Sequence, residues 1–291
     1  MSRLILPLAV IIVFAACAGA EEPGLDEGYV RHYEMQDGQG KIDWQNGYAT
    51  ATGMGMAPPG ASGEAQARAL AVRAATVTAR RNLLEIIGDV QIDSGTTIRN
   101  NMVANDSVQS IIRGELHNSR ILDTAYMSDG SVVVTVGISH RGVVADAVLP
   151  EAPAFKTGSQ QSAGAPQGVN TGGPYSGLVI DARGLEARPA LSPEIIGPEG
   201  ETVYGRKYVS RDFAVSQGMA GYAAGLASAF QNPRVGDNPL VIEARGVRGP
   251  GRTDLVVDQD AADKILAMAA ETDVLEQCRV MIVLDSGGYK E

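Results

Sequence analysis

The chain has 291 residues and a formal net charge of −10, from 24 Lys and Arg against 34 Asp and Glu. Nucleic-acid-binding proteins cluster Lys and Arg against phosphates, so this acidic composition argues against that class. The length allows two domains of ordinary size. Because aromatic residues make up only 5% of the chain, Ala, Val, Ile and Leu must form most of the core.

The N-terminal segment, residues 1–20, has the organisation of a secretory signal peptide. Arg3 supplies a positive charge, an apolar stretch follows over residues 4–14, and small residues precede Glu21. The apolar stretch is too short to cross a hydrocarbon layer of roughly 30 Å at about 1.5 Å per helical residue. We therefore predict a bacterial protein exported to the periplasm or the outer membrane, without a transmembrane helix.

Two cleavage sites compete within this segment. Residues 18–20 (Ala-Gly-Ala) form an A-x-A site that would leave Glu21 as the mature N-terminus. Residues 14–17 (Phe-Ala-Ala-Cys) resemble a bacterial lipobox, although an aliphatic residue is usual where Phe14 stands. Cys17 is therefore a candidate lipidation site, and the sequence leaves a soluble and a lipid-anchored form open.

Residues 21–40 are acidic and rich in Gly, and we expect them to form a mobile lead-in to an α+β domain over residues 41–149. The elements predicted there are a strand over 47–55, a helix over 64–88, a shorter helix over 103–116 and a hairpin over 121–139. Asp129-Gly130 is a strong turn signal between the two β-rich halves of the hairpin.

The predicted long helix carries two apolar stripes. The stripe expected to pack on the sheet comprises Ala65, Ala69, Val72, Thr76, Ala79, Leu83 and Ile86. The second stripe comprises Leu70, Val77 and Leu84, and Arg73, Arg80 and Arg81 flank it. Either the shorter helix of the same domain covers the second stripe, or the stripe is a surface for a partner.

Several segments of this domain carry a resemblance to a known family. They are residues 79–88 (ARRNLLEIIG), Ile92, residues 96–98, residues 110–114 and the Asp129-Gly130-Ser131 hairpin that ends at Gly142. From about residue 45 to about residue 145, the chain resembles the outer-membrane lipoprotein domain called Lpp-twenty and is similar to the N-terminal domain of flagellar assembly protein T.

The resemblance implies an envelope scaffold, ring component or surface lipoprotein that contacts envelope proteins or itself, with a flagellar accessory role among the options. It implies no catalytic residues. The C-terminal half does not resemble the later domains of flagellar assembly protein T.

A segment rich in Gly, Pro, Ser and Gln, residues 150–176, divides the chain. Such a composition buries too little apolar area to offset its ordering entropy. We predict a flexible linker there, followed by a second domain over residues 177–291.

The second domain contains an internal echo, since residues 178–184 (LVIDARG) recur as residues 240–246 (LVIEARG). If the two copies are neighbouring strands, Asp181 and Glu243 can pair crosswise with Arg245 and Arg183. These four residues are the candidate ligand-binding set. They form either a polar ligand site or a structural ladder of ion pairs. Catalysis by the two carboxyl groups is disfavoured, because a neighbouring Arg lowers the pKa of a carboxyl group and makes it a poor general acid.

The remaining elements of the second domain follow from turn and capping signals. They are a hairpin over 193–205, a helix over 211–231 capped by Ser210, a helix over 258–270 and a strand over 278–284. The predicted fold class is α+β, with two small domains that each have a mostly antiparallel sheet packed by helices.

The motifs of catalysis and cofactor binding are missing from the sequence. There is no G-x-G-x-x-G, Walker or G-x-S-x-G motif, and His32, His117 and His140 lack the spacing of a zinc site. The apolar residues that follow Cys278 predict that it lies in a buried strand. The sequence does not exclude the alternative that Cys278 is a nucleophile activated by His140. We therefore expect no cofactor and no metal.

The expected function is that of a non-catalytic scaffold or interaction protein of the bacterial cell envelope. The alternative is a periplasmic binding module or hydrolase for a small polar or carbohydrate ligand, which would use Asp181, Arg183, Glu243 and Arg245. A concave pocket lined by these four side chains would favour the alternative.

Overall fold

The computed structural model describes residues 31–34, 39–151, 154–156 and 175–285. The predicted signal peptide, the candidate lipidation site Cys17, most of the lead-in and most of the linker lie outside the described residues. Within the described ranges, no helix is long and apolar enough to span a membrane.

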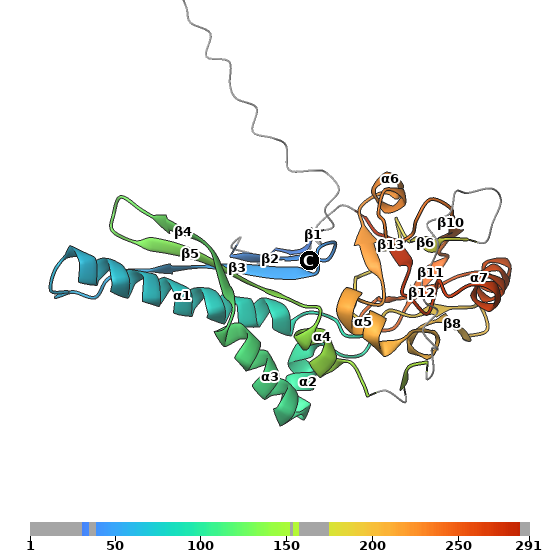
Figure 1. Ribbon diagram of the computed structural model, residues 1–291, viewed down its shortest axis with the longest axis horizontal. Helices are drawn as coiled ribbons and strands as arrows, with labels where there is room; N and C mark the ends of the chain where they lie inside the picture. Colours follow the sequence, from blue (N-terminus) through green and yellow to red (C-terminus); the bar gives the residue numbers. More distant parts are fainter. Residues whose placement is uncertain (1–30, 35–38, 152–153, 157–174, 286–291) are drawn as a thin grey trace, which may run out of the picture.

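The first domain is a five-stranded antiparallel sheet in the order β1-β2-β3-β5-β4, with helix α1 lying along one face (Figure 1). The strands are β1 (Arg31–Glu34), β2 (Gly40–Asp43), β3 (Tyr48–Gly55), β4 (Arg120–Tyr126) and β5 (Val132–Ser139). The helices are α1 (Glu64–Gly88), α2 (Ile98–Ala104), α3 (Asp106–His117) and α4 (Val143–Val148). The predicted long helix and hairpin are thus confirmed.

Helix α1 approaches β3 closely because two glycines of the strand carry no side chain. A Cβ atom on Gly53 would lie 2.1 Å from the backbone nitrogen of Ala79, and one on Gly55 would lie 2.2 Å from that of Ala75. Both distances are far shorter than a real Cβ contact, so the Gly-x-Gly spacing in the strand fixes where the small residues of the helix dock.

This docking rotates the buried stripe of α1 away from the predicted one. The buried residues of the helix are Ala71, Ala75, Ala79, Asn82, Leu83, Ile86, Ile87 and Gly88. The predicted stripe was therefore wrong at its start, where Ala65 and Ala69 are exposed. Several faces of this helix are rich in Ala and similarly hydrophobic. The position of the glycines in β3 therefore determines which face packs on the sheet.

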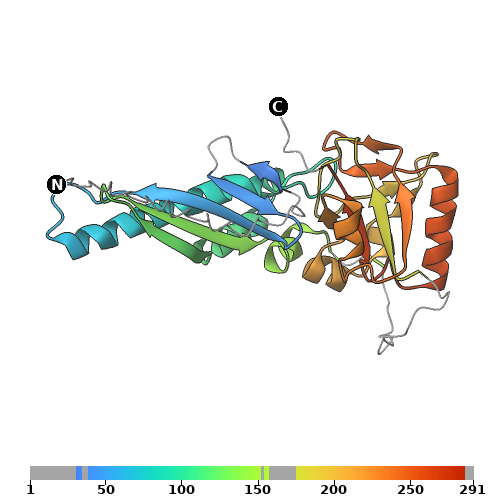
Figure 2. The same ribbon diagram turned by 90° about the horizontal axis from the view of Figure 1, so that it is seen from above.

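The second domain contains two four-stranded sheets (Figure 2). The larger sheet has the order β10-β6-β13-β9 and the smaller one the order β11-β12-β7-β8. The strands are β6 (Gly177–Asp181), β7 (Ile195–Ile196), β8 (Thr202–Tyr204), β9 (Gly221–Ala223), β10 (Pro239–Glu243), β11 (Gly246–Arg248), β12 (Asp254–Val256) and β13 (Val280–Val283). The helices are the 3₁₀ helix η2 (Arg206–Tyr208), α5 (Arg211–Gln217), α6 (Leu226–Phe230) and α7 (Gln259–Glu271).

The α+β class with two domains is confirmed, with one difference of detail. The strands of the larger sheet in the second domain pair in parallel, whereas an antiparallel sheet was expected. The two copies of the echo sequence are neighbours, as predicted, with Leu178 beside Leu240 and Asp181 beside Glu243.

The helix predicted over residues 211–231 is interrupted. Gly218 has a φ of 83° and ends α5 after Gln217. The chain then forms β9 at the edge of the parallel sheet before α6 begins at Leu226. Glycine reaches this positive φ without steric cost, so Gly218 ends the helix where the sequence predicted that it would continue.

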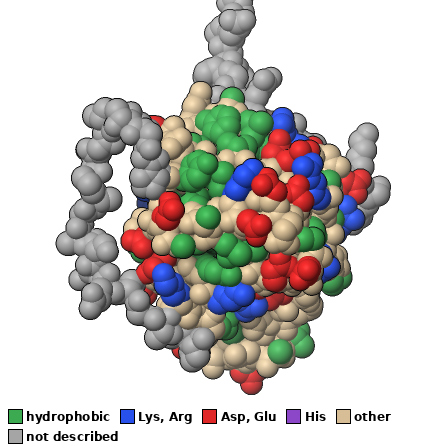
Figure 3. All heavy atoms as spheres, turned by 90° about the vertical axis from the view of Figure 1, so that its right-hand side faces the viewer, with side chains coloured by type: hydrophobic (Ala, Val, Ile, Leu, Met, Phe, Trp, Pro, Cys, Tyr) green, Lys and Arg blue, Asp and Glu red, His purple; other side chains and the backbone are tan. Residues whose placement is uncertain are grey.

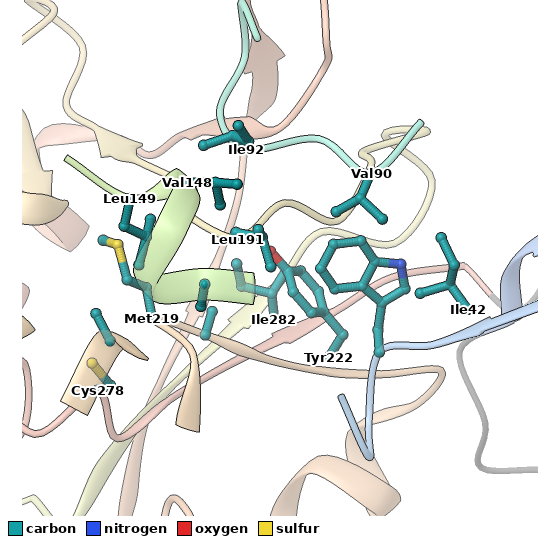
Figure 4. Packing of buried hydrophobic residues seen from close by; sticks show 14 of the residues in the cluster. Ile42, Val90, Ile92, Val148, Leu149, Leu191, Met219, Tyr222, Cys278 and Ile282 are labelled. Carbon is teal, nitrogen blue, oxygen red and sulfur yellow. The ribbon is translucent and has the colours of Figure 1, made fainter. Parts of the chain in front are cut away.

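The two domains lie end to end and share a continuous apolar core (Figure 4). Ile42, Val90 and Val148 of the first domain belong to the same cluster as Leu191 and Tyr222 of the second. Main-chain hydrogen bonds also cross the interface: Gly142 N donates to Val215 O at 2.9 Å, Leu191 N to Gln91 O at 3.0 Å, and Gly251 N to Ser94 O at 2.7 Å.

The first residues of the predicted linker also pack on the second domain. Phe155 is buried, and the backbone nitrogen of Lys156 donates to the carbonyl oxygen of Val209 at 3.0 Å. The Lys156 ammonium lies 2.5 Å from the carboxylate of Glu276. The two domains therefore form one docked body.

Candidate functional sites

The candidate ligand-binding set lies at the carboxyl ends of β6 and β10. Arg183 Nε donates to Asp181 Oδ1 at 2.8 Å and Arg183 Nη2 to Asp181 Oδ2 at 2.6 Å. Arg245 Nη1 donates to Glu243 Oε2 at 2.9 Å, and its Nη2 lies 3.0 Å from Asp258 Oδ2. The crosswise pairing predicted between the two strands was wrong, because each arginine folds back on the acid two residues before it.

The contacts of Asp181, Arg183 and Asp258 favour the ionised forms of these three side chains. The hydrogen bond from Arg183 lowers the pKa of Asp181, and the same contact raises the pKa of Arg183. The backbone amide of Ala261, followed by Arg245, lowers the pKa of Asp258. Carboxylates held in the ionised form cannot act as general acids near neutral pH.

The set lies at the carboxyl ends of parallel strands, where ligands often bind. The side chains of the set, however, are hydrogen-bonded to one another and to Asp258. The backbone nitrogen of Gly184 also donates to both oxygens of Asp285, at 3.0 and 2.9 Å. The face of the second domain in Figure 3 carries Lys and Arg next to Asp and Glu. Asp181, Arg183, Glu243 and Arg245 line neither of the two hollows described next.

The first hollow lies between the domains, against a buried histidine. Its walls include Trp44, His140, Arg141 and Leu191, and its volume of about 10 Å³ admits about one water molecule. His140 is 3% exposed, and its ring centroid lies 4.8 Å from that of Trp44. Trp44 in turn contacts Tyr222 edge-on at 5.4 Å between ring centroids.

Polar groups around this hollow are not all paired. Among the described residues, neither ring nitrogen of His140 has a hydrogen-bond partner. Gln45 Oε1 and Ser192 Oγ, which follow the wall residues Trp44 and Leu191 in the chain, also lack one. Burial, followed by the charge of Arg141, lowers the pKa of His140 to about 4. The imidazole is therefore neutral at physiological pH, and the hollow is a structural feature of the docked interface that suits one bridging water.

Two partly buried arginines beside this interface, Arg141 and Arg234, donate to main-chain carbonyls. Arg141 Nη2 donates to the carbonyl oxygen of Gln45 at 2.9 Å. Arg234 Nη1 donates to the carbonyl oxygens of Gly218 at 3.0 Å and Cys278 at 2.8 Å. These bonds hold loops of each domain in place, so both guanidinium groups have a structural role.

Cys278 does not have the properties of a nucleophile. It is fully buried with a free thiol, and burial raises its pKa to about 12. Such a thiol is protonated at neutral pH, whereas reactive cysteines have lowered pKa values. The pair with His140 that the sequence left open therefore lacks both an activated thiolate and a histidine poised near neutral pH.

The second hollow is an open groove along residues 70–78 of α1, on a part of the helix that lies away from the second domain (Figure 1). Its volume is about 550 Å³, and its walls are Met56, Pro58, Leu70, Arg73, Ala74, Val77 and Thr78. Val77 is 63% exposed and Met56 62% exposed. The second stripe of α1 is thus covered at one end only: Leu84 packs against the core, while Val77 stays open.

Sequence reasoning located the second stripe but missed the interdomain histidine. His140 follows β5 in the chain, and nothing in its neighbours in sequence signals burial. The one available signal was that the single Trp of an aromatic-poor chain, Trp44, needs a large buried site.

The comparison with known families concerns the second domain. The family model for the second domain of Treponema pallidum Tp0624 matches residues 177–286. The matched stretch begins with β6 and includes β13, so it corresponds to the second domain as a unit. No curated protein shows a significant match to the chain.

Proposed function

We propose that the protein is a non-catalytic scaffold or interaction protein of the bacterial cell envelope. The observation that carries this proposal is the open apolar groove on α1, where Val77 is 63% exposed and Met56 62% exposed. Exposed apolar surface costs solubility, and on a folded protein it commonly marks a contact surface.

Three further points support the proposal. The segment over residues 1–20 has the composition of an export signal, which would leave either a soluble protein that begins at Glu21 or a protein with a lipid anchor on Cys17. Residues from about 45 to about 145 resemble the Lpp-twenty and flagellar assembly protein T domains, which places envelope proteins first among the partners and a flagellar accessory role among the options. Asp181, Glu243 and Asp258 are paired with arginines, and burial keeps His140 and Cys278 neutral at physiological pH.

The alternative, a periplasmic binding module or hydrolase, draws support from one observation. Asp181 and Glu243 lie at the carboxyl edge of a parallel sheet, where ligands often bind. Their ion pairs with Arg183 and Arg245 argue against it, because a ligand must first displace a bonded arginine. Reproducible hydrolysis of glycan or ester substrates that disappears in a folded Asp181→Asn or Glu243→Gln variant would establish this alternative.

The scaffold proposal is tested by site-specific photo-crosslinking in the native host. A photoreactive amino acid at Val77 should yield a covalent adduct with a defined envelope protein, identified by mass spectrometry. The matched control is Val103 on α2, which is 81% exposed but lies outside the groove. Absence of any protein adduct at Val77, or the same adducts at both positions, would contradict the proposal.

Export is tested on material from the same host. Intact-mass measurement should show a mature chain that begins at Glu21 or at lipid-modified Cys17. A chain that retains residues 1–20 would end the envelope proposal.

A further inference from the structure

The groove on α1 has the geometry of one side of a helix–helix interface. Leu70, Val77 and Leu84 are spaced by seven residues, so they follow one line along the helix surface. Ala74 lies between the first two and leaves a depression, and Met56 and Pro58 form the opposite wall. Methionine side chains adapt their shape to what they contact, so this wall suits an irregular apolar partner.

The charge of this face is opposite to that of the whole molecule. Arg73, Arg80 and Arg81 flank the stripe, and residues 65–84 contain no carboxylate, in a chain of net charge −10. Arg73 lines the groove, and no described carboxylate forms an ion pair with it. Arg81 lies at 3.8 Å from Glu85, which is near the limit for an ion pair. Arg68 is paired with Glu64 at 3.1 Å. The groove is therefore an apolar strip with one basic side chain, Arg73, that no described carboxylate neutralises.

The apolar strip and the basic side chain together indicate which kind of partner fits the groove. A second copy of the same face would bring arginines against arginines, and like charges side by side are unfavourable. A β-strand would find little to pair with, because the backbone N–H and C=O groups of α1 are bonded within the helix. A helix with an apolar stripe and flanking carboxylates satisfies both the shape and the charge.

We propose that the groove formed by α1 with Met56 and Pro58 binds an amphipathic helix of an envelope protein whose apolar stripe is flanked by Asp and Glu. The apolar side chains of that helix fill the space around Ala74 between Leu70 and Val77. A carboxylate on its flank accepts a charge-assisted hydrogen bond from Arg73. This inference rests on the proposed function and adds the chemistry of the partner.

The test uses the mature protein and a pair of synthetic helical peptides. Both peptides contain three heptads with Leu on one stripe; the flanking positions are Glu in the first and Lys in the second. Fluorescence anisotropy should show that the Glu peptide binds about tenfold more tightly than the Lys peptide at low salt, with a difference that shrinks as salt is added.

Two variants assign this binding to the groove. Val77→Asp should abolish binding of the Glu peptide, and Arg73→Glu should reverse the preference in favour of the Lys peptide. Val103→Asp is the matched control, because it places the same charge on another exposed position, and it should bind like the unmodified protein. Circular dichroism and the unfolding midpoint of each variant establish that it is folded.

Other outcomes would overturn the inference. Equal binding of the two peptides, or binding that survives Val77→Asp, removes the acidic helix as the occupant. Sedimentation with phosphatidylglycerol vesicles that is lost in Val77→Asp identifies a membrane surface instead. A dimer that is lost in the same variant identifies a second copy.

Failure of this inference is distinguishable from failure of the proposed function. If crosslinking at Val77 captures an envelope protein while the peptides are not discriminated, the scaffold function stands and the partner chemistry is wrong. If neither experiment gives the expected result, both fail.

Discussion

The two ends of the first domain differ in what their apolar side chains contact. At the end that meets the second domain, Trp44, His140 and Tyr222 pack together in a core shared by both domains. At the far end, Val77 and Met56 face solvent over a groove. The same sheet and the same helix support both ends, so the difference lies in the side chains and not in the architecture.

The comparison suggests that different parts of α1 have different roles. Its last turns bury Leu83, Ile86 and Ile87 and contribute to stability, while its middle, around Leu70 to Val77, presents an apolar and basic surface on one side. Substitutions at the interface should therefore change the free energy of unfolding, and substitutions at the groove should leave it nearly unchanged.

The largest contrast is expected between Trp44→Ala and Val77→Ala. Removing a buried indole leaves a cavity in the shared core and should reduce the free energy of unfolding by about 3–5 kcal/mol. Val77→Ala removes an exposed side chain and should change it by less than about 0.5 kcal/mol. Urea unfolding of both variants measures the difference, and equal losses would mean that the groove is part of the core.

A second contrast compares two glycines of the first domain. Gly53→Ala puts a Cβ atom 2.1 Å from the backbone nitrogen of Ala79 and should destabilise the protein by about 1–3 kcal/mol through overpacking. Gly114→Ala on α3 meets no atom within 4 Å and should stabilise it by up to about 1 kcal/mol. A neutral Gly53→Ala in thermal unfolding would contradict the close docking of α1 on β3.

The interface should also weaken at acid pH. The pKa of His140 is about 4 in the folded protein, against an ordinary value of 6.5. The contribution of neutral His140 to the free energy of unfolding is complete above pH 6.5. It is lost as the pH falls toward 4, because the imidazole takes up a proton in the unfolded chain before it does so in the folded protein. Between pH 7 and pH 5 the loss should be about 2 kcal/mol.

The pH prediction has a matched pair of variants. His140→Phe keeps a ring in the interface and should remove this part of the pH dependence, while His117→Gln, at an exposed position of α3, should leave it unchanged. Arg141 and Asp43 are the charged groups that act on His140, so both must be retained. An unchanged pH dependence in His140→Phe would show that His140 is accessible to protons in the folded state.

The smallest effect is expected at the ion pairs of the second domain. Arg183→Ala removes a half-exposed arginine from Asp181, and solvent-exposed ion pairs contribute little to stability. The unfolding midpoint should hardly move, and the variant should bind the Glu peptide like the unmodified protein. A clear loss of stability would show that the pair has a structural role as strong as the interface.

The sequence was sufficient for features determined locally. Asp129-Gly130 located the hairpin, and the Ala-rich run located α1 to its ends, because turn chemistry and helix periodicity act over a few residues. The apolar groove was also visible as the stripe containing Leu70 and Val77, with its interpretation left open.

Features determined by distant contacts could not be predicted in this way. The break at Gly218 depends on β9 joining the parallel sheet, which adjacent sequence does not reveal. The intrastrand pairing of Asp181 with Arg183 depends on the turn that follows β6. The burial of His140 depends on the docking of the second domain, and no pattern around His140 encodes that surface.

The most direct test of the central claim is a paired measurement on the Val77→Asp variant: its affinity for the Glu peptide and its free energy of unfolding. If the groove is a contact surface, binding is abolished while the free energy of unfolding stays within about 0.5 kcal/mol of that of the unmodified protein. Retained binding, or a loss of stability comparable to that of Trp44→Ala, would contradict the assignment of this end of the molecule to partner recognition.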